Sequence, residues 1–134
     1  MILTGIRIEF PKAVYTIPIR SKYTVLTGNG AIGKSSMLKL DWTGAIKTKG
    51  VIQFKSMDAS TAAYLKSGVN TIYVLDTDQM KRLRTEDISL FNQSACQFLF
   101  ICRDVDQRLS VHRKDILTLK QDGKNYIGTQ LYVS

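Results

Sequence analysis

The chain has few of the residues from which disulfide frameworks and metal sites are built. It contains two cysteines, Cys96 and Cys102, and one histidine, His112. Both cysteines lie in one apolar run that we expect to be a strand, where six residues of extended chain would separate them by roughly 20 Å. A disulfide requires Cα atoms within about 7 Å of each other. We therefore expect two buried thiols and no zinc site.

Long hydrophobic runs are also missing. No stretch approaches the roughly 18 consecutive apolar residues of a membrane span. The beginning of the chain, Met1–Arg7, lacks the basic start and apolar stretch of a signal peptide. We expect a cytoplasmic protein without a membrane partner. Hydrophobic residues make up 44% of the chain and charged residues 22%, and these values with the length predict a single globular domain over residues 1–134.

Acidic residues are scarce relative to basic ones. The chain contains 11 Asp and Glu residues and 19 Lys and Arg residues, which gives a formal net charge of +8. Such an excess is compatible with a nucleic-acid partner. The candidate cations are Lys47, Lys49, Lys55 and the run Lys81–Arg84. A surface that binds single strands by stacking would require aromatic residues interleaved with these cations, and the sequence does not interleave them in that way. Two interpretations therefore stay open, a basic solvated surface and a nucleic-acid-binding face.

Apolar residues alternate or cluster in a pattern that predicts strands separated by helices. A polar tetrapeptide, Gln121–Lys124, contains Asp-Gly and predicts a hairpin near the end of the chain. Gly68 is placed to end a helix in a left-handed turn. The expected strands are 2–10, 13–17, 23–27, 51–54, 71–75, 98–101, 116–120 and 125–133, and the expected helices are 33–40, 60–66 and 85–91. We therefore expect an α/β fold with a mainly parallel sheet, an N-terminal β-hairpin and a C-terminal hairpin.

The most specific pattern follows the short strand predicted at 23–27. It has the form G-x-x-x-x-G-K-[ST], in which glycines allow the backbone N–H groups to surround phosphates at a helix N-terminus. Lys34 is placed to reach the β- and γ-phosphates and the Ser35 hydroxyl to ligate Mg2+, while Ser36 adds a hydrogen bond near the α-phosphate. The segment reads Gly28-Asn29-Gly30-Ala31-Ile32-Gly33-Lys34-Ser35.

A second feature is an apolar strand that ends in a carboxylate, Ile72–Asp76. Ligands of open parallel sheets bind at the carboxyl ends of the strands. We therefore expect Asp76 to lie beside the phosphate-binding segment, as a magnesium ligand together with Ser35.

These two segments resemble the Walker A and Walker B motifs of the P-loop NTPase superfamily. The resemblance implies a three-layer P-loop NTPase fold with a sheet flanked by helices, ATP and Mg2+ as ligands, and Asp76 holding the metal through water. The strands before and after 72–76 are similar to those of the additional-strand branch that includes AAA and ABC ATPases. That comparison places a polar sensor after the strand at 98–101, at Arg103 or Asp104.

Several residues depart from the usual pattern. Many such ATPases have a Glu directly after the Walker B Asp, and here Thr77 stands at that position, with Asp78 as the substitute base. No Leu-Ser-Gly-Gly-Gln signature and no guanine-reading Asn-Lys-x-Asp motif is present, which argues against a standard ABC transporter subunit and favours ATP over GTP. One of Arg103, Arg108 and Arg113, or an arginine from a partner or a second copy of the chain, could act as an arginine finger.

Three functions stay open. The leading hypothesis is a magnesium-dependent ATPase or an ATP-operated switch, with Lys34, Asp76, Asp78 and Arg103 as its catalytic residues. The second is a nucleotide-binding interaction module with little turnover, which the missing Glu favours. The third is a small-molecule kinase, in which the stretch from Asp104 to Lys114 would form the lid.

Overall fold

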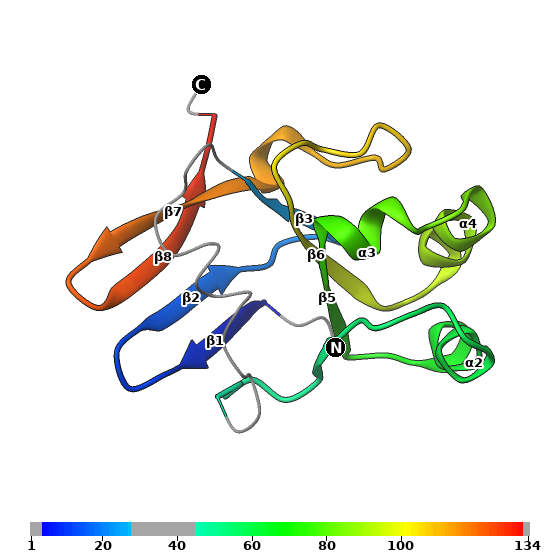
Figure 1. Cartoon of the computed structure of the whole chain (residues 1–134), viewed down its shortest axis with the longest axis horizontal. Helices are drawn as coiled ribbons and strands as arrows, with labels where there is room; N and C mark the ends of the chain where they lie inside the picture. Colours follow the sequence, from blue (N-terminus) through cyan, green and yellow to red (C-terminus); the bar gives the residue numbers. More distant parts are fainter. Residues whose placement is uncertain (1–3, 28–44, 133–134) are drawn as a thin grey trace.

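A computed structural model describes residues 4–27 and 45–132 of the chain (Figure 1). Its strands are β1 (Gly5–Glu9), β2 (Val14–Pro18), β3 (Tyr23–Leu26), β4 (Val51–Gln53), β5 (Ile72–Asp76), β6 (Gln97–Ile101), β7 (Ile116–Asp122) and β8 (Asn125–Gln130). Its helices are α2 (Ala59–Ser67), α3 (Thr77–Lys81), α4 (Thr85–Gln93) and the short 3-10 helix η1 (Arg113–Asp115). No helix in these two ranges is long and apolar enough to cross a membrane.

All eight strands belong to one mixed sheet with the order β1-β2-β8-β7-β3-β6-β5-β4. From β7 to β4 the neighbouring strands run parallel to one another. Two antiparallel hairpins, β1 with β2 and β7 with β8, form the other end of the sheet. The hairpins are joined to each other because β2 and β8 pair in parallel.

The two ends of this sheet are brought together, so that it is nearly closed into a barrel. Ile8 of β1 forms an antiparallel bridge with Ile46, which lies shortly before β4 in the chain. Two backbone hydrogen bonds of 2.9 Å, from Glu9 N to Ala45 O and from Lys47 N to Arg7 O, hold this contact. The outer edge of β1 is therefore paired, and the sheet curves around its own interior.

One face of the parallel strands is covered by helices. Side chains from β3, β5 and β6 on this face pack with Leu65 of α2, Met80 of α3 and Phe91 of α4. The ring of Phe91 stacks on that of Phe98 with centroids 4.2 Å apart. This aromatic contact fixes α4 against the central strand β6.

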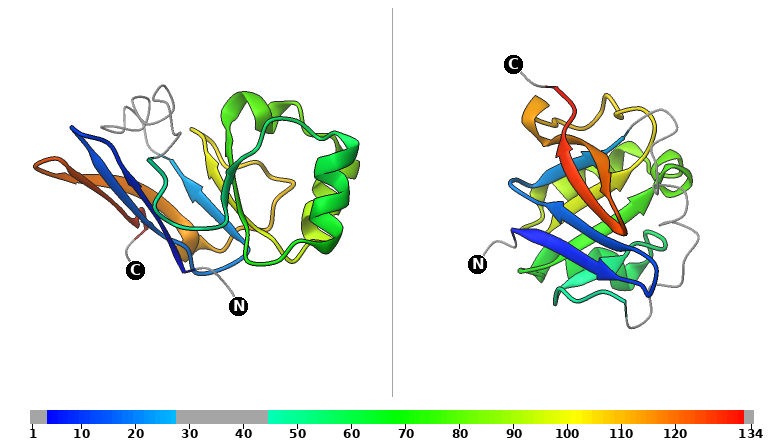
Figure 2. Two further views of the ribbon diagram at one scale, coloured as in Figure 1. Left: turned by 90° about the horizontal axis from the view of Figure 1, so that it is seen from below. Right: turned by 90° about the vertical axis from the view of Figure 1, so that its left-hand side faces the viewer.

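The opposite face is covered by the hairpins of the same sheet. Val74 and Leu99, which point away from the helices, share a core with Ile6, Tyr15 and Leu117 of the hairpin strands. Figure 2 shows the resulting arrangement, with the hairpins and the helices on opposite sides of the parallel strands. Strands buried on both faces are typical of parallel sheets, and here strands take the place that helices usually have on the second face.

The expected three-layer α/β P-loop NTPase fold, with a mainly parallel sheet flanked by helices, is therefore wrong. Among the described residues there are eight strands and three α-helices, and all three helices contribute to the same core cluster. The alternation of apolar segments indicates which residues form strands and helices. It does not indicate that the two hairpins pair with each other and continue the sheet, because β2 and β8 are more than 100 residues apart in the chain.

Gly68 ends α2 for a reason that the sequence pattern does not show. Its φ is −69°, so the expected left-handed turn is wrong. A Cβ at this position would lie 2.6 Å from Cε1 of Tyr64 and 2.7 Å from the Tyr64 carbonyl oxygen. The glycine is required because α2 ends in close contact with its own last turn.

We predict that Phe91→Ala lowers the free energy of unfolding by about 3–5 kcal/mol, because it leaves a cavity at a side chain that is fully buried. The measurement is urea denaturation followed by circular dichroism. Val69→Ala is the control, since Val69 is 59% exposed and its truncation should change stability by less than about 0.5 kcal/mol. Equal effects of the two substitutions would show that α4 does not pack on β6 as described.

Candidate functional site

The carboxyl ends of β3, β6 and β5 meet at one edge of the sheet, where these strands lie side by side (Figure 1). Ile101 is paired with Leu26 on one side and with Asp76 on the other. Because neighbouring strands are about 4.8 Å apart, Leu26 and Asp76 lie roughly 10 Å from each other across β6. The chain segments that leave these three strands therefore begin close together.

Thr27, the residue after β3, is held firmly at this edge. It is buried, its N–H donates a hydrogen bond of 2.8 Å to the carbonyl of Leu117, and its hydroxyl donates to the carbonyl of Arg103. The carboxyl end of β3 is thus fixed to the segment that follows β6 and to the beginning of β7. The predicted phosphate-binding residues that follow lie outside the described residues: Gly28, Asn29, Gly30, Ala31, Ile32, Gly33, Lys34, Ser35 and Ser36.

Asp76 is the N-cap residue of α3. Its Oδ1 accepts a hydrogen bond of 2.8 Å from the Gln79 N–H, and the Gln79 side chain accepts one of 2.9 Å from the Asp76 N–H. The amide group of Gln79 also donates to the carbonyl of Phe54, which links α3 to the end of β4. This capping box explains why an Asp ends β5, and it sets the direction in which α3 leaves the sheet.

Thr77 and Asp78 form the first turn of α3. Asp78 is exposed to solvent, whereas Thr77 is half-buried. The structure therefore places the predicted base, Asp78, two residues after the predicted metal ligand, Asp76, but on the surface of the helix. A magnesium role for Asp76 and a base role for Asp78 stay predictions.

Arg103 and Asp104 follow β6 and line an open pocket of about 330 Å3. Thr27 forms another part of its wall, so this pocket lies beside the point where the Gly28–Ser35 segment begins. Its other side is formed by Leu131 and Tyr132 near the C-terminus. The structure thus brings Arg103 and Asp104 next to Thr27, while Asp76 lies two strands away and does not line this pocket.

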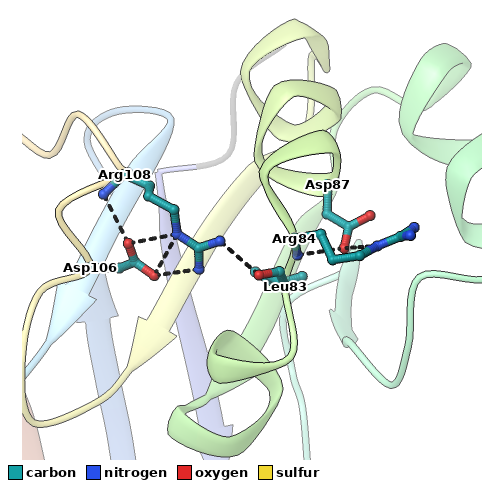
Figure 3. Close-up of polar contacts among 5 residues, drawn as sticks. All are labelled: Leu83, Arg84, Asp87, Asp106 and Arg108. Atoms are coloured by element: carbon teal, nitrogen blue, oxygen red, sulfur yellow. Dashed lines mark hydrogen bonds and ion pairs between the residues drawn. The ribbon is translucent and has the colours of Figure 1, made fainter.

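The three candidate arginines have different environments. The guanidinium of Arg108 donates to both carboxylate oxygens of Asp106, with a shortest distance of 2.7 Å, and also to the carbonyl of Leu83 (Figure 3). The guanidinium of Arg113 lies 4.5 Å from the ring centroid of Tyr132. Within the described part of the chain, Arg103 is the one of the three whose side chain has no ion pair or ring contact, and it is exposed. Arg103 is therefore the best placed of them to meet an incoming anion.

Asp106 is a structural residue that the sequence analysis missed. The hydrogen bonds from the Arg108 side chain lower the pKa of the Asp106 carboxyl below its ordinary value, although partial burial opposes this effect. The pair fastens the loop after β6 to the connection between α3 and α4, because Arg108 also bonds Leu83 there. The sequence signal that could have predicted this ion pair is an Asp two residues before an Arg in a polar stretch.

Metal-binding groups are sparse in the part of the chain that the structure describes, which holds no cluster of three or more His, Cys, Asp or Glu side chains suited to an ion. His112 is exposed, and its Nδ1 accepts a hydrogen bond from the Lys114 N–H. Cys96 and Cys102 are buried and are not joined in a disulfide.

We predict that Asp106→Asn lowers the free energy of unfolding at neutral pH by about 0.5–1 kcal/mol, the range of a partly exposed ion pair. Because the folded-state pKa of Asp106 is lowered, its contribution is present above the unfolded pKa of about 3.9 and is lost as the pH falls through the folded value. Urea titrations from pH 7 toward pH 3 should show the gap between wild type and variant closing. Asp104→Asn is the control, and a gap that stays constant with pH would contradict the role of the Asp106 charge.

Comparison with known proteins gives no support for the expected family. No protein-family model matches the chain, and no curated protein matches it significantly. Together with the mixed, nearly closed sheet, this makes the identification as a member of the P-loop NTPase superfamily, in its additional-strand AAA and ABC branch, wrong. The resemblance rested on two short segments, and the function of those segments has to be judged by their own chemistry.

Proposed function

We propose that the chain binds ATP with Mg2+ at the carboxyl-terminal edge of the parallel strands and hydrolyses its γ-phosphate. The observation that carries the proposal is the position of Thr27. This residue is fixed between the segment that follows β6 and the beginning of β7, and the Gly28–Ser35 segment follows it directly in the chain. A glycine-rich segment with a lysine therefore starts at an edge that already presents Arg103.

The chemistry of phosphate binding supports this assignment independently of fold family. Glycine-rich backbone exposes N–H groups to an anion, and the Lys34 ammonium adds a positive charge that suits β- and γ-phosphate oxygens. The Ser35 hydroxyl and the Asp76 carboxylate are oxygen donors of the kind that Mg2+ takes in proteins. When bound, the ion would neutralise charge on the phosphates. Arg103, exposed beside Thr27, would add a further positive charge at the same edge.

A second candidate function, a nucleotide-binding module with little turnover, is favoured by the surroundings of Asp76. One oxygen of this carboxylate is engaged in capping α3, and the next residue is Thr77 rather than a carboxylate that could act on an attacking water. Asp78 is the nearest substitute and lies on the exposed surface of the helix. Binding without phosphate release would identify this second function. Transfer of phosphate to a nucleoside, nucleotide or sugar would identify the small-molecule kinase.

We predict that Lys34→Ala weakens Mg-ATP binding by about tenfold to a hundredfold, the loss expected for one charged hydrogen-bonding partner. Isothermal titration calorimetry measures binding, and a phosphate-release assay on the same samples measures hydrolysis. Lys66→Ala is the matched control. It also removes one lysine, but this lysine is exposed in the last turn of α2 and is distant in sequence from the proposed ATP-binding residues. Thermal melting of both variants checks that they remain folded.

Identical affinities of wild type, Lys34→Ala and Lys66→Ala for Mg-ATP would contradict the proposal. Binding that is lost only in Lys34→Ala, with no phosphate released by the wild type, would retain the site and replace the ATPase with the module of low turnover.

Asp76→Asn separates the two roles of this residue. Asparagine is as good an N-cap as aspartate, so we expect the free energy of unfolding to stay within about 0.5 kcal/mol of wild type. The affinity for Mg-ATP and the rate of phosphate release should fall, since the amide is a poorer magnesium ligand than the carboxylate. Asp76→Ala, which also removes the cap, should cost about 1 kcal/mol of stability. If Asp76→Asn leaves both nucleotide measurements unchanged, Asp76 is only a helix cap.

A further inference from the structure

A second pocket, of about 320 Å3, lies between the segment that follows β4 and the α3–α4 connection, and three cationic residues line it. Lys55 comes from the segment after β4, Arg82 from the C-cap of α3 and Arg84 from the N-cap of α4. All three residues are exposed. Two parts of the chain, the segment after β4 and the α3–α4 connection, thus place three cationic residues around one pocket.

These cations are only weakly neutralised. Among the described residues, the side chains of Lys55 and Arg82 take part in no ion pair. Arg84 is 74% exposed, and its Nε lies 3.8 Å from carboxylate oxygens of Glu86 and Asp87. The pair with Glu86 is exposed on both sides and contributes little energy, while the buried carboxylate of Asp87 neutralises Arg84 in part. The pocket therefore carries an excess of positive charge that an anion would balance.

The backbone that holds the cations is fixed by hydrogen bonds and a buried apolar floor. Phe54 and Leu83 are 2% and 6% exposed at the base of the pocket. Asp87, which is buried, accepts a hydrogen bond of 2.9 Å from the Arg84 N–H, as Figure 3 shows. Gln79 ties α3 to the Phe54 carbonyl, and Arg108 holds the Leu83 carbonyl from the other side. The backbone from which the three cationic side chains extend is therefore held in place by these contacts.

The chemistry of the pocket favours the phosphodiester backbone of a duplex over other polyanions. Guanidinium groups match the geometry of phosphate oxygens, and two of the three cations are arginines. The one aromatic residue of the lining, Phe54, is buried, so the pocket offers no ring on which an unpaired base could stack. A surface with cations and without stacking rings suits contact with phosphates rather than with bases. The net charge of +8 would strengthen the initial association.

We propose that Lys55, Arg82 and Arg84 form a binding surface for the phosphate backbone of double-stranded nucleic acid, without sequence specificity. This surface is separate from the ATP site proposed above, and neither depends on the other. The same edge of the sheet would then carry two anion sites, one after β3 and one after β4. Duplex DNA and duplex RNA share the phosphodiester chemistry, and the binding experiment distinguishes them.

The test is fluorescence anisotropy of the full chain with labelled 20-base-pair DNA and RNA duplexes of scrambled sequence, at several salt concentrations. The double variant Lys55→Ala/Arg82→Ala should bind the preferred duplex at least about tenfold more weakly at low salt. The slope of log affinity against log salt concentration should fall by about 2, one for each lost phosphate contact. Circular dichroism confirms that the variant is folded.

The matched control is Lys12→Ala/Lys124→Ala, which removes the same number of charges from the turns of the two hairpins. We expect less than about a twofold change and an unaltered salt slope, because these lysines would not touch phosphate. Equal losses in the two double variants would mean that net charge alone drives binding, which overturns the proposal.

Other outcomes also overturn it. Absence of binding to either duplex at low salt excludes the surface. Tighter binding of a single-stranded oligonucleotide than of the duplex would indicate base stacking elsewhere. Binding of polyglutamate with the same affinity and the same loss in Lys55→Ala/Arg82→Ala would assign the pocket to acidic polypeptides.

Discussion

The structure depends on three adjacent parallel strands that are buried on both faces. Every residue of β3 and β6 is buried, as are the first four residues of β5. Such strands cannot exist without cover on each side, since each exposed apolar side chain would lose about 1.5–3 kcal/mol of burial energy. Helices α2, α3 and α4 supply the cover on one face and the two hairpins on the other. The sheet is curved because the two hairpins belong to it, and they can cover the second face of the parallel strands only if the sheet bends toward that face.

The same constraint decides where polar chemistry can occur. With both faces and most of the length of these strands buried, charged side chains are confined to the strand ends. Asp76 is the last residue of β5, while Thr27 follows β3 and the pair Arg103 and Asp104 follows β6. Hydrogen bonds then fix these ends to one another, as between the Thr27 hydroxyl and the Arg103 carbonyl. The carboxyl-terminal edge of the sheet is thus held in place by these hydrogen bonds, and both anion sites that we propose lie along it.

The loop after β6 is also held in place at this edge. Leu109 is buried in the helical core, and Arg108 joins Asp106 to the carbonyl of Leu83. These contacts connect the surroundings of Arg103 with the α3–α4 connection that carries Arg82 and Arg84. The two pockets are therefore held by one continuous set of contacts.

Local sequence patterns determined which segments form strands and where polar residues end them. The buried strands β3, β5 and β6 lie where apolar runs predicted them, and Asp76 ends β5 as expected, because burial and turn chemistry act within a few residues. Partners that are distant in the chain could not be predicted in this way. The pairing of β2 with β8, the bridge between Ile8 and Ile46, the use of Asp76 as a helix cap and the contact of Arg108 with Leu83 all depend on the folded arrangement. For this reason the phosphate-binding chemistry of Gly28–Ser35 could be proposed from sequence alone, whereas the nearly closed sheet and the second basic pocket were decided by tertiary structure. A motif is a property of adjacent residues, but a sheet's closure and a pocket's charge arise only when separate segments meet.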